Sequence, residues 1–178
     1  MKKVKNFRYL GKSDVKNPNV FLHAVVQCWG LNWSKNFNFL VNSSLYPPLR
    51  DPDFEYNFTQ HHLGQMVEMA YIILRQCGLQ PLPDYRPLAG HNRLFETGSS
   101  EAIDPEKTIQ YFFGFKKLDQ WYEVLCELQL SRDITNIGWD HIPLGPECLL
   151  IRDLLTDLPL ALLEIHKRGG MQHRIPCA

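Results

Sequence analysis

Residues 57–78, NFTQHHLGQMVEMAYIILRQCG, decide the fold of this chain. Their apolar side chains return at the three- and four-residue spacing of one buried face of an α-helix. The members of that face are Leu63, Met66, Val67, Ala70, Tyr71, Leu74 and Cys77. Asn57 or Thr59 is expected to cap the start of the helix, and Gly78 is expected to end it. The stretch therefore predicts a long amphipathic helix packed on a hydrophobic core.

Three further helices are expected behind start signals that pair a proline with a capping or acidic residue. They cover residues 20–29, 104–130 and 146–166. Gly114 is expected to kink or split the second of them, and Pro159 to break the third. The predicted buried stripe of the first consists of Phe21, Ala24, Val25 and Cys28. Helices are therefore expected to make up most of the chain.

Strand signals are weak by comparison. Residues 36–41, NFNFLV, alternate apolar and polar side chains and are compatible with one short strand. Proline-rich connections are expected at residues 43–56 and 80–103. The sequence predicts a mainly α fold: a single-domain irregular helical bundle with long Pro-rich loops and at most a small β element.

The sequence predicts a chain of three parts, the first of which is distinguished by its charge. Residues 1–16 carry six Lys and Arg residues against Asp14, although the formal net charge of the whole chain is zero. We expect this basic N-terminal arm to be solvated and poorly ordered, with a short edge strand at VKNFRYL as the alternative. Residues 17–170 are expected to form the helical domain, and residues 171–178 a C-terminal tail.

Several classes of protein are disfavoured by the sequence. It contains no run of eighteen apolar residues, so no transmembrane helix is expected, and its basic start lacks the apolar core of a secretory signal. The five cysteines are far apart and form no CxxC pair. They are interpreted as reduced, mostly buried thiols, which favours a cytoplasmic protein without membrane association.

The predicted helix at residues 57–78 also carries candidate metal ligands. His61, Gln65 and Glu68 fall at positions i, i+4 and i+7 and share one face, while His62 lies on a neighbouring face. Imidazole and carboxylate together suit zinc or another divalent transition metal. A third ligand would have to come from another segment, and the candidates are His23, His91, Asp140 and His141. In the alternative interpretation, both helix histidines are solvated residues of the first turn.

One resemblance supports the metal interpretation. His62-Leu63-Gly64-Gln65 resembles the HxGQ part of the last helix in DinB-type four-helix metalloproteins, and Gln76-Cys77-Gly78 resembles the end of that helix. The resemblance covers about twenty residues and implies a helical metal-binding protein. Phe58 stands where that motif has its earlier histidine ligand, and a phenyl ring cannot bind a metal.

A second resemblance concerns residues 20–29. Phe21-Leu22, Ala24-Val25 and Gln27 resemble the helix that follows the catalytic cysteine in papain-like ubiquitin-specific proteases. Val20 stands at the position of the nucleophile, and valine has no thiolate. The resemblance therefore implies an inactive relative of these enzymes.

The sequence contains no Walker A, GxGxxG, GxSxG or HExxH pattern, so no reaction is indicated. Tyr85, Arg86 and Arg93 in the long connection suit the centre of a protein interface. We therefore predict a non-catalytic intracellular domain that mediates protein–protein interaction without a cofactor. One alternative is a metal-dependent enzyme or metal-binding protein that uses His61, His62 and Glu68. The other is nucleic-acid binding through the basic arm.

Overall fold

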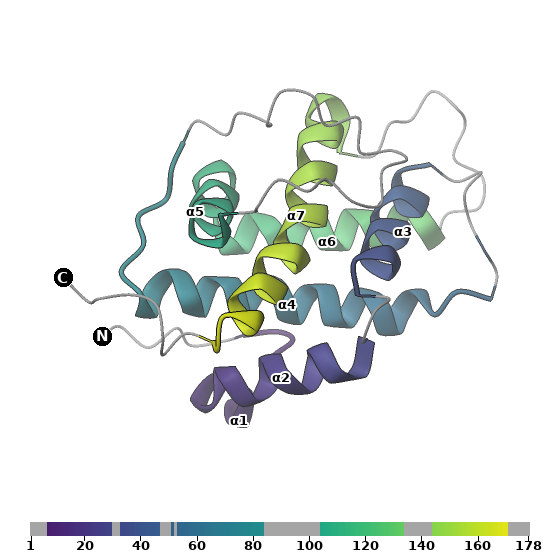
Figure 1. The fold of residues 1–178 in the computed structure, drawn as a ribbon. Helices are drawn as coiled ribbons and strands as arrows, with labels where there is room; N and C mark the ends of the chain where they lie inside the picture. The colour runs from purple at the N-terminus through teal and green to yellow at the C-terminus, as the bar shows by residue number, and fades with distance from the viewer. Residues whose placement is uncertain are drawn as a thin grey trace.

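The computed structural model describes residues 7–29, 33–46, 51, 53–83, 104–133 and 144–170 (Figure 1). The helices are α1 (Lys12–Lys16), α2 (Pro18–Trp29), α3 (Trp33–Leu45), α4 (Tyr56–Gln76), α5 (Pro105–Phe115), α6 (Leu118–Asp133) and α7 (Cys148–Lys167), with a 3-10 turn at Gly145–Glu147. No strand occurs in these described ranges. The predicted mainly α fold class is confirmed.

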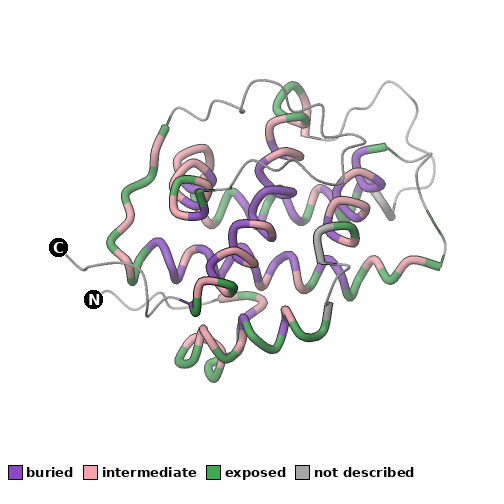
Figure 2. Tube along the Cα trace, viewed as in Figure 1, coloured by how far each residue is buried: buried purple, intermediate pink, exposed green. Residues whose placement is uncertain are grey.

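Two long helices, α4 and α7, organise the packing. In Figure 1, α7 crosses over α4, and α3 and α5 lie on either side of α7. Helix α7 contacts α2, α3, α4 and α5, while α6 packs against α3 and α4. Figure 2 shows buried residues running along both α4 and α7, so these two helices carry much of the core.

Aromatic side chains fill the contact between α5 and α6. The ring of Trp121 stacks on the ring of Phe112, with centroids 3.9 Å apart and planes at 13°. Its indole N–H donates to the carbonyl oxygen of Phe112 at 3.0 Å. Both side chains are fully buried. The tryptophan thus buries a large apolar surface while its one polar group keeps a partner.

Helix α4 follows the predicted register. Leu63, Met66, Val67, Ala70 and Leu74 are buried, whereas Tyr71 and Cys77 are half-buried. The predicted end is also confirmed. Gly78 has φ of 65°, and the N–H of Leu79 donates to Leu74 O at 3.0 Å, which is the long bond of a Schellman motif.

The predicted start of α4 is wrong. Its N-cap is Glu55, which makes no side-chain capping bond. Thr59 instead donates its hydroxyl to Glu55 O at 2.9 Å from inside the helix. Helix α4 also begins earlier than predicted, so Asn57 and Thr59 are ordinary helical residues of its first turn.

The predicted third helix is divided near Gly114, as expected. The carboxylate of Asp104 accepts the N–H of Lys107 at 3.2 Å and starts α5. A new start follows where the N–H of Lys117 donates to the Gln120 side chain at 2.9 Å. At Gly114 an added Cβ would lie 1.8 Å from Leu82 O, so the connection after α4 crosses α5 where only glycine leaves room.

Two local predictions are wrong because tertiary packing overrides them. Residues 36–41 belong to α3, since its buried apolar side chains, Phe37, Leu40, Val41 and Leu45, keep helical spacing. Pro159 does not break α7, which runs unbroken from Cys148 to Lys167. Leu155, Leu158 and Leu162 are fully buried on both sides of the proline. Their packing offsets the cost of a proline inside a helix.

Helix α2 is present, but its buried face differs from the prediction. Leu22 and Val25 are buried, whereas Ala24 and Cys28 are exposed and Phe21 is half-buried. The expectation of mostly buried thiols is likewise wrong for the described cysteines. Cys28 and Cys126 are exposed, and Cys77 and Cys148 are intermediate. The contacts of α2 with α1, α4 and α7 set its register, which apolar spacing alone leaves ambiguous.

None of the helices in the described ranges combines the length and apolar character that a membrane span requires.

Candidate functional site

The predicted polar face of α4 lies beneath the N-terminal arm. His61 is exposed and Gln65 is half-buried, whereas Glu68 is fully buried. All three touch Tyr9: the ring of His61 lies 5.7 Å from the Tyr9 ring, Gln65 Nε2 donates to Tyr9 O at 3.3 Å, and Glu68 accepts the Tyr9 N–H at 3.1 Å. The three side chains therefore share one face of α4, and that face binds the N-terminal segment around Tyr9 of the same chain.

Glu68 binds three successive backbone amides. Its Oε1 accepts the N–H of Arg8 at 2.5 Å, and its Oε2 accepts the N–H of Leu10 at 2.7 Å. The Tyr9 amide lies between them, 3.1 Å from each oxygen. Consecutive N–H groups that converge on one anion form a nest, and such charge-assisted bonds are stronger than neutral ones.

Tyr122 of α6 completes the environment of this carboxylate. Its hydroxyl donates to Glu68 Oε1 at 2.6 Å. Burial, and then the hydrogen bond to Glu68, raises the pKa of Tyr122 well above the ordinary 10.0, so the phenol keeps its proton. The guanidinium of Arg8 lies over the Tyr122 ring, 4.3 Å from its centre. The buried charge is therefore balanced by four donors and a nearby cation.

Gly64 makes room for this arrangement. A Cβ added at Gly64 would lie 2.7 Å from three atoms of the Tyr9 ring. Leu10, next along the arm, is only 7% exposed and belongs to the core. The glycine of the HxGQ pattern therefore fits the approach of an aromatic ring in this protein.

The expectation of a poorly ordered arm is wrong for residues 7–10, because they are bonded to α4 and packed on the core. The alternative of an edge strand is wrong for the same residues, which have no strand structure. Residues 1–6 lie outside the described part of the chain. Apolar Phe7, Tyr9 and Leu10 were the sequence signal that distinguished this segment from a solvated tail.

Only some of the predicted metal ligands lie within the described residues. The rings of His61 and His62 lie 6.0 Å apart, and His62 Nδ1 is 2.9 Å from Phe58 O. Burial, opposed by this backbone contact, lowers the pKa of His62. Within the described ranges, no group of three or more His, Cys, Asp or Glu side chains is placed to hold a metal. Binding through Glu68 would require it to release residues 8–10, so this site stays a prediction.

His23 lies on α2 and is exposed, whereas the other candidates lie outside the described residues: His91, His141, Asp140, Tyr85, Arg86 and Arg93.

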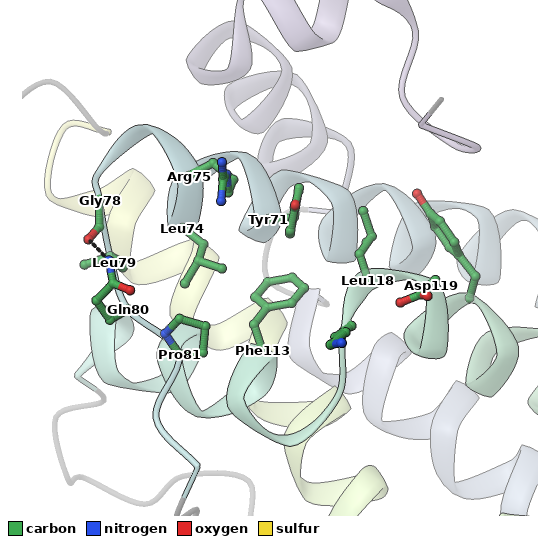
Figure 3. A pocket seen from close by; sticks show the side chains of 12 residues that line it. Tyr71, Leu74, Arg75, Gly78, Leu79, Gln80, Pro81, Phe113, Leu118 and Asp119 are labelled. Carbon is green, nitrogen blue, oxygen red and sulfur yellow. Dashed lines mark hydrogen bonds between the residues drawn. The ribbon is translucent and has the colours of Figure 1, made fainter. Parts of the chain in front are cut away.

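A groove lies beside the arm, at the C-terminal end of α4 (Figure 3). It has a volume of about 520 Å³. Its lining comes from three places: Tyr71, Leu74 and Arg75 of α4 with Gly78, Leu79, Gln80 and Pro81 after it, Phe113 of α5, and Lys117, Leu118, Asp119 and Tyr122 at the start of α6. Of these residues, Tyr71 and Leu74 belong to the face of α4 that the sequence predicted to be buried, and apolar spacing does not show that they also line a groove.

Two tyrosines, Tyr71 and Tyr122, line the groove and also contact residues 7–10 of the N-terminal arm. The Tyr71 ring makes an edge contact with Phe7, with centroids 6.4 Å apart, and another with Phe113 at 5.4 Å. Tyr122 lines the groove and also bonds Glu68. The buried carboxylate thus fixes the tyrosine that forms one wall of the groove.

No protein-family model matches the sequence, and no curated protein or solved structure matches it either.

Proposed function

We propose that this chain is a non-catalytic helical domain that binds an acidic, apolar segment of a partner protein. The groove at the C-terminal end of α4 is the binding site in this proposal. The observation that carries it is a hollow whose lining combines apolar side chains with two cations.

The apolar part of the groove suits a large hydrophobic side chain. Leu74 is 5% exposed and Phe113 6% exposed, so each adds a small apolar area to the floor of the hollow. Tyr71 and Leu118 are half-buried around them. Figure 3 shows Leu74, Phe113 and Pro81 facing the same space. A volume of about 520 Å³ is within the usual range of ligand pockets and has room for a few peptide side chains.

The charges around this hollow favour an acidic partner. Arg75 and Lys117 are exposed lining residues, and Asp119 is the one acidic side chain in the described lining. Arg8 lies against Tyr122. The sequence adds three lysines within residues 1–6, directly before Phe7. Complementary charge of this kind speeds association and favours the matching partner.

The chemistry of the lining supports binding rather than catalysis. Its described residues include no Ser, Cys or His, so they do not form the hydroxyl–imidazole or thiol–imidazole pair that activates a nucleophile in many hydrolases. The hydroxyl of Tyr122 is engaged by Glu68. The groove therefore supplies surface and charge.

Selection from a library of random short peptides tests this function. We expect the wild-type protein to enrich peptides in which Asp or Glu flanks Leu or an aromatic residue. Binding of a selected peptide, followed by fluorescence polarisation, should weaken as salt rises. The variant Arg75→Glu/Lys117→Glu should lose these peptides and enrich basic ones.

The matched control is Lys12→Glu/Lys16→Glu. It makes the same change of charge on exposed residues of α1, none of which lines the groove. It should bind the selected peptides with nearly unchanged affinity. Equal enrichment by the wild type and the groove variant would contradict the proposal. If polyuridine displaced the selected peptides from the wild type but not from the control variant, the result would point to nucleic-acid binding instead.

A further inference from the structure

The middle of α2 and the C-terminal end of α7 bring two histidines together on a different part of the molecule. The ring centroids of His23 on α2 and His166 on α7 lie 5.3 Å apart, with the planes at 44°. His23 is exposed and His166 is half-buried. The two residues come from opposite ends of the sequence, so only the packing of α2 on α7 pairs them.

The spacing fits two imidazoles that share one metal ion. A zinc–nitrogen bond of about 2.1 Å places each ring centre about 3.2 Å from the ion, and a tetrahedral angle then separates the two centres by about 5.2 Å. The observed separation is 5.3 Å. Imidazole is a preferred ligand of zinc, copper and nickel, and water can fill the open positions.

From this geometry we propose that His23 and His166 form a two-histidine site for a divalent transition-metal ion such as Zn²⁺. The site is independent of the groove, whose lining contains neither residue.

The backbone around this site is fixed. Gly170 N–H donates to Ile165 O at 2.9 Å, and an added Cβ at Gly170 would lie 2.8 Å from Asn19 Oδ1. Helix α2 is thus held close to the end of α7, one turn from each histidine.

A bound ion would connect α2 to the rest of the domain. In α2, Leu22 and Val25 are the buried apolar residues among those with described side chains. A metal bridge between His23 and His166 therefore adds a link where the hydrophobic contact is small. Zinc binding is expected to protect the α2 amides from hydrogen exchange and to raise Tm.

Titration of the purified chain with zinc chloride, followed by calorimetry, tests the proposal. We expect one zinc per chain, and His23→Ala or His166→Ala should each weaken binding by roughly 10- to 100-fold. Zinc at about a hundred times its dissociation constant should raise the Tm of the wild type by about 5 °C. Each single variant should show about half of that rise or less at the same zinc concentration, since its dissociation constant is higher.

The matched control is His61→Ala/His62→Ala, which removes the other neighbouring pair of histidine rings. It should bind zinc as the wild type does. Loss of binding in this control, with retention in the His23 and His166 variants, would overturn the proposal and place the metal on α4. Absence of zinc binding to the wild type would overturn it as well. Circular dichroism of each variant verifies that the fold is intact.

Discussion

Glu68 is the residue whose role changes most between sequence and structure. At i+7 from a histidine it has the spacing of a metal ligand, yet its oxygens hold the amides of residues 8–10 and the hydroxyl of Tyr122. A carboxylate with no exposed surface needs such donors, because an unpaired buried charge is costly. At this position, burial and the available donors favour a structural anchor.

Tyr122 gives this anchor a signature at alkaline pH. Its pKa is raised from 10.0 in the folded protein, so its contribution to stability is complete below pH 10 and is lost as the pH rises further. The free energy of unfolding should fall above pH 10, because the unfolded chain releases the phenolic proton first. In Tyr122→Phe, this fall should be shallower by about 1.4 kcal/mol per pH unit. Urea unfolding at a series of pH values measures both slopes.

Tyr46→Phe is the control for this pH dependence, because Tyr46 is 39% exposed. It should keep the alkaline slope of the wild type. Burial also raises the pKa of Tyr9, so a residual slope is expected in Tyr122→Phe. Identical slopes in wild type and Tyr122→Phe would contradict the raised pKa of Tyr122, and with it the buried position of the phenol beside Glu68.

Among the elements, the connection after α4 is fixed by its contact with α5. The N–H of Leu82 donates to Gln110 O at 3.0 Å, and Gln110 Nε2 donates to Gln80 O at 2.9 Å. Gly114 allows the backbone of Leu82 to cross α5 at this point. The same connection forms one side of the groove, so a helix glycine determines the shape of the proposed binding site.

The sign of the stability change in Gly114→Ala tests whether the connection after α4 lies against α5. Alanine alone would stabilise a helix by about 1 kcal/mol relative to glycine. Its Cβ would meet Leu82 O, and we expect the clash to lower the free energy of unfolding by about 1–3 kcal/mol instead. Amide exchange at Leu82 should accelerate. Stabilisation by Gly114→Ala would show that the connection does not lie against α5.

At the scale of the whole molecule, the arm at residues 7–10 is part of the core. Deletion of residues 1–10 removes Leu10 and leaves Glu68 without its three amide donors. We expect the free energy of unfolding to fall by about 3–5 kcal/mol. Urea denaturation measures this loss.

Deletion of residues 1–6 is the matched control, since it removes three lysines but keeps Phe7 and every donor to Glu68. It should change the free energy of unfolding by less than about 0.5 kcal/mol. The two truncations together separate the charge of the arm from its packing. If both lost stability equally, the contacts of residues 7–10 would not explain the effect.

The sequence by itself determined the mainly helical fold, the register and end of α4, the start of α5 and the break near Gly114. These features follow from apolar spacing, capping residues and glycine, which act within a few residues along the chain. The same local reasoning failed where a stronger non-local contact competed with it, at α3, in α2 and at Pro159.

Only the tertiary structure decided what the polar face of α4 does. The donors to Glu68 lie 54 to 60 residues away in sequence, and His23 meets His166 only through the packing of α2 on α7. The opening beside Tyr71 and Tyr122 likewise depends on how α4, α5 and α6 meet. Local pattern specifies which helices form, because their bonds are local. Which faces are covered and which stay open depends on contacts between distant segments.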